Sequence, residues 1–414
     1  MSPSPRILLA DCDHMFVSVA RLADPEGAGK ARLLAVGGSK ARGVVVSASY
    51  EARAYGVRAG MPSARAARLC PGLVFAPVPA GAIGAKHREI RAVLELWAPV
   101  VEAASVDEFY LDLSGTERVY RGEPLAETAA RLRQAVRERT GLTLSIGGGT
   151  NRLVAKLAAD RAKPRPNTDG TGVLIIAPGG EAGFLAGLTL AEIPGVGPRL
   201  QATLKRFGLV QVQEALRLDA ATFESWLGPG TGRWLFERIR GRASEAVHSR
   251  PENKSISHEQ TFSRDLASDE AIETRLLSLV TGLAGELRAD RLATRCVTVK
   301  LRDHDFRTRQ ASRTLPEPLA TDRALWEVAR GLLAQLRRRR RTAARLVGVS
   351  FSSLDSGSGP AQLALLPPEG ASSETARDKR LATAVDDIKG KLGRDSIQPA
   401  RLLRGPGRKQ SPPR

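Results

Sequence analysis

Two neighbouring carboxylates, Asp107 and Glu108, stand in the stretch ASVDEFYLDL between apolar residues that favour strands. Successive side chains of a strand point to opposite faces, so both acids can share one site only at a strand end or a turn. The flanking sequences predict a hairpin with the acid pair at its bend. Two such carboxylates repel each other unless a cation lies between them, and hard divalent ions such as Mg²⁺ prefer oxygen ligands. The pair is therefore a candidate part of a metal site.

A third acid, Asp11, ends the apolar run RILLAD, where a predicted strand meets its loop. If that strand pairs beside the hairpin, three carboxylates could hold two metal ions about 3.5 to 4 Å apart, the spacing used for in-line phosphoryl displacement. The pattern alone leaves a second interpretation open, because acids that merely cap helices and turns are common. Further sequence blocks are needed to decide between the two.

The elements that must position these acids form an α/β region over residues 6 to about 176. Strands are predicted in RILLADCD, RLLAVGG and GVVVSASY, and helices over 124–140 and 151–162. Residues 178–242 then become helical and glycine-punctuated around EIPGVGPRLQATLKRFGL. The polar, proline-containing stretch 243–253 is a predicted linker.

A separate α+β domain is predicted over 254–355. Its strands are expected in SISHEQTFSRDL, TRCVTVKLRDHDF and RLVGVSFSSL, and two amphipathic helices begin near Asp269 and Ala320. Residues 356–414 are rich in Gly, Ser and Pro, which predicts a largely flexible tail with one short helical candidate, DKRLATAVDDIKGKLG.

The chain is strongly basic. Its 63 Lys and Arg residues outnumber its 44 Asp and Glu residues, giving a net charge of +19 and a pI near 10.6. This balance favours nucleic acid as partner, and an anionic membrane second, although a GC-rich genome would also enrich arginine. The three cysteines, Cys12, Cys70 and Cys296, are scattered, so no disulfide framework or zinc site is predicted. No signal peptide or membrane span is visible, and a cytoplasmic protein is expected.

Five ordered blocks, LLADCDHMF, GVVVSASYEARAYGVRAGMP, SVDEFYLDL, TNRLVAKLAADRAKP and IPGVGP, resemble the Y-family translesion DNA polymerases, closest to the DinB (DNA polymerase IV) branch. The resemblance covers residues 6 to about 355. It implies a multidomain α/β and α+β fold with the right-hand polymerase architecture. The implied parts are a palm (1–13 and 80–177), fingers (14–79), a helical thumb (178–242), a linker (243–253), a little finger (254–355) and a flexible tail (356–414).

The resemblance also implies how the acids act. Asp11, Asp107 and Glu108 match the catalytic, metal-binding acids for two Mg²⁺ ions, and Cys12 matches a position whose backbone carbonyl faces a metal. Ser105 is expected to orient the acid pair. Asp13 is expected to make local backbone hydrogen bonds and not to bind metal.

Nucleotide contacts follow from the same comparison. Phe16 matches the aromatic steric gate that excludes a ribose 2′-hydroxyl, although a Phe here could also be plain core. The residues that match triphosphate contacts are Ser47, Tyr50, Arg53 and Lys163. Lys156, on the predicted helix from 151, is left out of this set, with a surface lysine as its alternative. His14, Met15 and Ala20 depart from the residue types usual in the family, which leaves the shape of the base pocket and the lesion preference open.

The remaining matches concern macromolecular partners. Gly195 and Gly197 belong to a helix-hairpin-helix whose backbone N–H groups would bind DNA phosphates without reading bases. Arg337–Arg341 is interpreted as a partial DNA contact, with a solvated helix end as the alternative. A short clamp-binding motif is expected at Gln362, Leu363, Leu365 and Leu366. The expected partners are primer-template DNA, deoxynucleoside triphosphates and a sliding clamp, with no membrane, and a monomer is expected.

The sequence thus predicts a template-directed DNA polymerase of low fidelity that acts in translesion synthesis and lacks a proofreading segment. One alternative is a catalytically silent scaffold that keeps the fold, the DNA grip and the clamp peptide. A nucleotidyl cyclase also sets carboxylates and two metals on a palm-like sheet, but the helix-hairpin-helix and the positive charge disfavour it.

Overall fold

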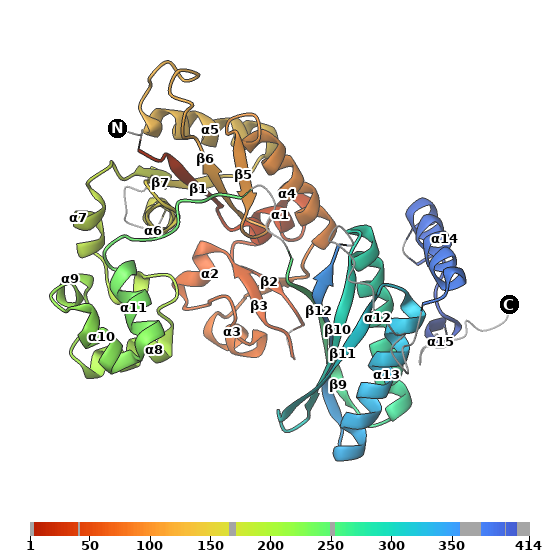
Figure 1. Cartoon of the computed structure of the whole chain (residues 1–414). Helices are drawn as coiled ribbons and strands as arrows, with labels where there is room; N and C mark the ends of the chain where they lie inside the picture. The colour runs from red at the N-terminus through yellow and green to blue at the C-terminus, as the bar shows by residue number, and fades with distance from the viewer. Residues whose placement is uncertain are drawn as a thin grey trace, which may run out of the picture. The chain divides into compact units, whose positions relative to one another are not determined.

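The computed structural model describes residues 4–39, 42–164, 171–248, 253–356, 374–393 and 395–403. The chain divides into two compact units, Met1–Pro251 and Glu252–Arg414. This boundary falls inside the predicted linker 243–253. Figure 1 shows the elements of each unit, which are described one unit at a time.

A five-stranded sheet with the order β5-β6-β1-β7-β8 forms the centre of the first unit. Side chains alternate across it: Leu8 and Phe109 face the core under two helices, whereas Ile7, Leu9 and Tyr110 face a third helix. The strands are β1 (Ile7–Cys12), β5 (Val100–Ala103), β6 (Glu108–Asp112), β7 (Leu144–Gly149) and β8 (Val173–Ile175). Helices α4 (Ala80–Leu94) and α5 (Leu125–Thr140) pack on the first face, and α6 (Arg152–Ala162) on the second (Figure 1).

The close packing of α6 on the sheet depends on a glycine. A Cβ at Gly147 in β7 would overlap the backbone nitrogen of Ala159 and the carbonyl oxygen of Ala155. Only a residue without a side chain lets the helix backbone approach this closely. This contact fixes α6, and with it two lysines, above the strands that carry the acids.

A small sheet with the order β3-β2-β4 forms the second part of this unit. Its elements are α1 (Met15–Ala23), β2 (Leu34–Gly37), β3 (Val45–Ala48), α2 (Tyr50–Ala54), α3 (Ser63–Leu69) and β4 (Val74–Ala76). Ser49 caps α2 by accepting the N–H of Ala52. Two small apolar clusters hold α1, α2 and α3 against the sheet, so the start of α2 has a fixed position.

A group of short helices completes the first unit. They are α7 (Glu181–Ala186), η1 (Leu190–Glu192), α8 (Pro198–Arg206), α9 (Val212–Ala215), α10 (Ala220–Leu227) and α11 (Pro229–Arg238). Their apolar core includes Leu153 and Leu157 of α6. Helix α6 therefore packs between the large sheet and the short helices.

The second unit contains a four-stranded antiparallel sheet with the order β11-β10-β12-β9. Its elements are β9 (Ser255–Leu266), α12 (Asp269–Ala289), β10 (Ala293–Asp303), β11 (Thr308–Leu319), α13 (Asp322–Arg339) and β12 (Ala344–Asp355). One apolar cluster joins α12 and α13 to this sheet (Figure 1). These elements confirm the strands and helices predicted here. Within the described ranges, no helix has the length and apolar character needed to cross a bilayer.

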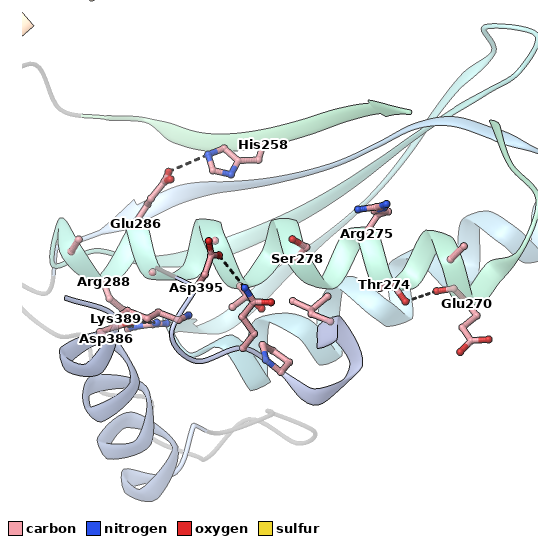
Figure 2. Close-up of a pocket in the computed structure, with 18 of the residues that line it drawn as sticks. His258, Glu270, Thr274, Arg275, Ser278, Glu286, Arg288, Asp386, Lys389 and Asp395 are labelled. Carbon is pink, nitrogen blue, oxygen red and sulfur yellow. Dashed lines mark hydrogen bonds and ion pairs between the residues drawn. The ribbon is translucent and has the colours of Figure 1, made fainter. Parts of the chain in front are cut away.

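The described part of the C-terminal tail does not fit the prediction of a flexible segment, because it folds back on the second unit as α14 (Ala376–Leu392) and α15 (Ala400–Leu403). Arg288 of α12 binds Asp386 of α14, with Nε 2.6 Å from Oδ2. The Glu374 carboxylate accepts the N–H of Ala320 at 2.6 Å, and Arg401 binds Glu273 at 2.9 Å. A cavity of about 1110 Å³ lies between this segment and α12 (Figure 2). This segment is held by ion pairs with residues that are distant in the sequence. Such contacts cannot be predicted from the composition of the segment itself.

Candidate active site

The two strands that carry acids are neighbours. β1 pairs antiparallel with β6, and Asp11 lies directly opposite Glu108 in the register. Asp107 lies in the turn between β5 and β6, and its carbonyl accepts the N–H of Cys12 at 2.8 Å. The predicted hairpin with the acid pair at its bend, and the pairing of the Asp11 strand beside it, are both confirmed. By alternation, Asp11 and Glu108 share the sheet face on which α6 packs.

Each of these opposed acids is bound by a lysine of α6. Lys163, at the C-terminal cap of the helix, lies 2.7 Å from Asp11 Oδ2, and Lys156 lies 2.8 Å from Glu108 Oε1. The surface alternative for Lys156 does not fit this contact, and leaving the residue out of the site was wrong. Its spacing of seven residues from Lys163, two helical turns, was a signal for the shared face.

Burial and these lysines set the protonation of the site. Burial raises the pKa of Asp11 to about 6, even though Lys163 acts in the opposite direction. Burial alone would lower the pKa of Lys163, but Asp11 and Asp160 outweigh it and raise that pKa. Burial and Glu108 compete in the same way at Lys156, whose pKa is also raised. Both lysines are therefore cationic at neutral pH.

Ser105 organises the turn that holds the acid pair. Its hydroxyl donates to Asp107 Oδ1 at 2.5 Å and accepts the backbone N–H groups of Asp107 and Glu108 at 3.2 and 3.0 Å. One side chain thus fixes both the backbone of the turn and the orientation of one carboxylate. The expectation that Ser105 orients the pair is confirmed.

The carboxylate oxygens of Asp11, Asp107 and Glu108 are the type of donor that a hard divalent cation prefers. The Cys12 thiol is no competing ligand, since burial and then the nearby acids raise its pKa and keep it protonated. In the described part of the chain, no three His, Cys, Asp or Glu side chains stand in a ready metal-holding group. Two of the three acids are bound to lysines instead, so an ion would have to displace those ammonium groups.

Asp13 and His14 connect β1 to α1. Asp13 Oδ1 accepts the Ser145 hydroxyl at 2.7 Å, a contact 132 residues away and not the local backbone bonding that was expected. His14 adopts a left-handed backbone with φ 48°, which is uncommon for a residue other than glycine. Its ring lies edge-on to Tyr50. Burial, reinforced by Arg53, lowers the His14 pKa to about 4, so the ring is neutral.

The predicted nucleotide contacts come from the start of α2 and the adjoining strand. Arg53 Nε donates to the Ala48 carbonyl at 3.0 Å, and its guanidinium lies 5.7 Å from the centre of the Tyr50 ring. Burial raises the pKa of Tyr50 and lowers that of Arg53, and the charge of Asp11 acts on both. These groups therefore lie within electrostatic range of the acid site. Ser47 is buried at the end of β3.

Phe16 lies in the first turn of α1 and is only half-buried. Its ring packs at the edge of two apolar clusters, one under the large sheet and one beside the small sheet. A half-buried ring is compatible both with a steric gate and with a place in the core, so both interpretations of Phe16 remain predictions.

The glycine turn predicted as a phosphate contact lies between η1 and α8. Gly195 has φ 100°, and a Cβ there would meet the Trp234 ring at 2.6 Å, so no side chain fits. Gly197 is the N-cap residue of α8, and Pro198 begins the helix. Both glycines are exposed.

The arginine run in the second unit is divided between two roles. Arg337 is buried and pairs with Asp269, Arg340 binds Asp303 at 2.7 Å, and Arg341 also binds Asp269. Arg338 and Arg339 are exposed and make no ion pair with the described residues. These last two arginines therefore have no carboxylate in the described ranges that would compete with another anion. The predicted clamp-binding residues Gln362, Leu363, Leu365 and Leu366 lie outside the described ranges.

Comparison with known proteins identifies the class. Residues 10–160 match the impB/mucB/samB family, and residues 253–365 match the C-terminal domain of that family. A DNA polymerase IV of Methanoculleus marisnigri is 37% identical over 360 residues, covering 86% of this chain and 97% of that protein. A DNA polymerase IV of Xanthomonas euvesicatoria is 36% identical over 370 residues, covering 88% and 99%.

Solved structures of similar fold are also Y-family DNA polymerases. A Y-family DNA polymerase chimera, Dbh-Dpo4(243-245)-Dbh, matches with a TM-score of 0.73 and 26% identity, covering 84% of this chain and 98% of that one. An insertion ternary complex of Dbh DNA polymerase has a TM-score of 0.59 at the same identity and coverage. The fold and the matched families define a right-hand polymerase. The chain belongs to the Y-family of DNA polymerases, in the DNA polymerase IV branch.

Proposed function

We propose that this chain is a DNA-directed DNA polymerase that extends a primer 3′-end with deoxynucleotides, with Asp11, Asp107 and Glu108 as its catalytic centre. The observation that carries this proposal is the register of β1 and β6, which sets Asp11 opposite Glu108 beside the Asp107 turn. Family membership supports translesion synthesis in DNA repair as the setting. The small three-stranded sheet of the predicted fingers accords with low fidelity.

The three acids and the Cys12 carbonyl would hold two Mg²⁺ ions, a cation that the hard oxygen donor set favours. When bound, such ions lower the pKa of the attacking 3′-hydroxyl and neutralise the leaving pyrophosphate. Ser105 keeps the acid-bearing turn in place through its three hydrogen bonds. The family is metal-dependent, and the number and identity of the ions are part of this proposal.

The triphosphate would be held by Ser47, Tyr50, Arg53 and Lys163. Phosphoryl transfer needs positioning and charge neutralisation more than covalent chemistry from the protein, and these hydroxyl and cationic groups supply both. Phe16 would exclude the ribose 2′-hydroxyl. Lys163 would exchange Asp11 for a phosphate oxygen as the nucleotide and the metal arrive.

The right-hand parts are assigned as the sequence predicted them: palm 1–13 and 80–177, fingers 14–79, thumb 178–242, linker 243–253 and little finger 254–355. DNA would contact the turn of Gly195 and Gly197, together with Arg338 and Arg339 in the little finger. We further propose that the chain acts as a monomer and that the segment from Gln362 to Leu366 binds a sliding clamp.

Primer extension on an undamaged template with Mg²⁺ tests the proposal. The wild type should extend the primer, whereas Asp107→Ala/Glu108→Ala should not, at equal occupancy of DNA. Asp112→Asn at the far end of β6 is the matched control, because its carboxylate only accepts the Ser114 N–H, and it should retain activity. If the wild type binds DNA without extending it, the catalytically silent scaffold replaces this proposal.

A further inference from the structure

A small cationic pocket of about 260 Å³ lies between α6, β6 and the segment that follows α11. The residues of its lining that matter here are Tyr110, Arg152, Lys156, Pro194, Arg238 and Ser244. All of them belong to the first unit, and α6 packs against both the sheet and the short helices that frame the pocket. The pocket is therefore built from fixed elements.

The charges around this pocket do not balance. Glu102 binds Arg152 through both carboxylate oxygens, and Glu108 binds Lys156. Arg238 has no carboxylate partner and no hydrogen-bond acceptor among the described residues, and its guanidinium only lies 5.6 Å from the centre of the Trp234 ring. Two carboxylates thus face three cations. A guanidinium with free N–H donors on a pocket wall favours a tetrahedral oxyanion, because it can bind two of the oxygens at once.

The position of the pocket indicates which oxyanion. Lys156, which lines the pocket, is bound to the candidate metal ligand Glu108. Pro194, also in the lining, directly precedes the glycine turn of Gly195 and Gly197. The pocket therefore lies between the acid site and the turn proposed to grip DNA. A strand that ends at the acids and runs along that turn passes its backbone phosphates over the pocket.

We infer that this pocket binds one backbone phosphate of the primer strand, close to its 3′-end, with Arg238 as the main ligand and Lys156 beside it. This inference rests on the proposed function and adds a specific anchor to it. This site would link DNA binding to the catalytic acids, because Lys156 both lines the pocket and binds Glu108. A primer whose end phosphate occupies the pocket is thereby aligned with the acids.

Removing single phosphate charges from the primer tests the inference. A set of six primers is prepared, each with one neutral methylphosphonate at a different one of the last six linkages. The Kd of each primer for the wild type is measured by fluorescence anisotropy. We expect one linkage near the 3′-end to weaken binding about tenfold, as for a lost hydrogen bond to a charged group. Arg238→Gln should weaken binding of the unmodified primer by a similar factor and lose all sensitivity at that one linkage.

Arg233→Gln is the matched control. Arg233 lies on the same helix, pairs with Glu224 and Glu237, and does not line the pocket. This variant should keep the full methylphosphonate pattern of the wild type. A thermal melt of each variant should show wild-type stability, since the Arg238 side chain makes no hydrogen bond or ion pair with the described residues.

Two results would overturn the inference: an identical methylphosphonate pattern in the wild type and Arg238→Gln, or wild-type affinity in Arg238→Gln. A pocket for free phosphate would instead give a rise in Tm with inorganic phosphate at constant ionic strength, lost in Arg238→Gln, and no linkage-specific effect. The binding assay needs no catalysis. If the wild type fails to extend primers but shows the linkage effect, the proposed function fails and the phosphate anchor stands.

Discussion

Asp11 and Glu108 lie opposite each other on neighbouring antiparallel strands, and lysines two turns apart on α6 bind one each. The sheet register fixes the separation of the acids, whereas the long lysine side chains can swing away. The carboxylates of Asp11 and Glu108 are thus balanced by the protein's own cations. If Asp11 and Glu108 bind a divalent cation as proposed, the two ammonium groups compete with that cation for the carboxylates.

Lys156→Met should raise the affinity of the free protein for a divalent cation. The substitution removes the charge that competes at Glu108, and an ion pair whose side chains are 26% and 27% exposed is worth about 1 kcal/mol, or roughly fivefold in affinity. Titration with Mn²⁺, followed by the loss of the free-ion electron paramagnetic resonance signal, measures this change. Lys86→Met, which removes an ion pair with Glu89 on α4, is the control and should leave the titration unchanged. Weaker Mn²⁺ binding in Lys156→Met would contradict the competition.

Phe16→Ala should allow ribonucleotides into the site. The ring lies half-buried at the start of α1, and removing it opens space where a ribose 2′-hydroxyl would otherwise clash. The ratio of kcat/KM for a ribonucleotide to that for the matching deoxynucleotide measures the effect, and we expect a rise of at least about a hundredfold, or roughly 2.7 kcal/mol.

Val17→Ala is the control for lost packing. Val17 follows Phe16 on the same helix but is fully buried in an apolar cluster. This variant should lose about 2 kcal/mol of stability while its sugar discrimination stays unchanged. If both variants discriminate like the wild type, Phe16 is core and not a gate.

The acid site could be predicted from sequence because its determinants are local. Alternation places Asp107 and Glu108 at a bend, and the apolar run before Asp11 marks a strand end. The helix predicted over 151–162 forms as α6 (Arg152–Ala162) for the same reason: its periodicity is a property of neighbouring residues.

Partners that meet only when helix α6 packs on the sheet could not be predicted in this way. Glu102 and Arg152 are 50 residues apart, and Lys156 meets Glu108 across 48. The arginine run shows the same limit, because a charged sequence does not reveal that Arg337 is buried against Asp269. The tail helix was expected from its periodicity, whereas its docking depends on Arg288, 98 residues from Asp386.

Arg288→Ala should release the C-terminal segment from α12. Arg288 is mostly buried and binds Asp386, Asp322 and the Ala320 carbonyl, so its loss leaves two carboxylates without a partner at one interface. Hydrogen exchange of the α14 amides should accelerate by at least about a hundredfold, because breaking such a pair costs roughly 3 kcal/mol. Arg275→Ala is the control, since Arg275 lines the same cavity on α12 without an ion pair among the described residues (Figure 2). Unchanged exchange in α14 would show that apolar packing alone docks the segment.

Glu102→Gln should destabilise the first unit in a pH-dependent way. Burial alone would raise the pKa of Glu102, but the Arg152 side chain and the His248 N–H outweigh it and lower that pKa. An acid whose pKa is lowered by folding adds stability that is complete above its ordinary pKa of 4.5 and is lost as the pH falls through its folded value. We therefore expect Glu102→Gln to cost about 2 kcal/mol at pH 7 and progressively less below pH 4.5.

Urea unfolding of the full chain at pH 7 and pH 4 measures this difference, with Glu245→Gln as the control. Glu245 is exposed in the stretch 243–248, which also contains His248, and it makes no ion pair with the described residues. An equal loss at both pH values would mean that Glu102 contributes by shape alone. If the pH dependence appears, the charged Glu102 stabilises the first unit through its ion pair with Arg152 and its hydrogen bond from the His248 N–H. Arg152→Met should then remove the same stability as Glu102→Gln, with no further loss in the double variant.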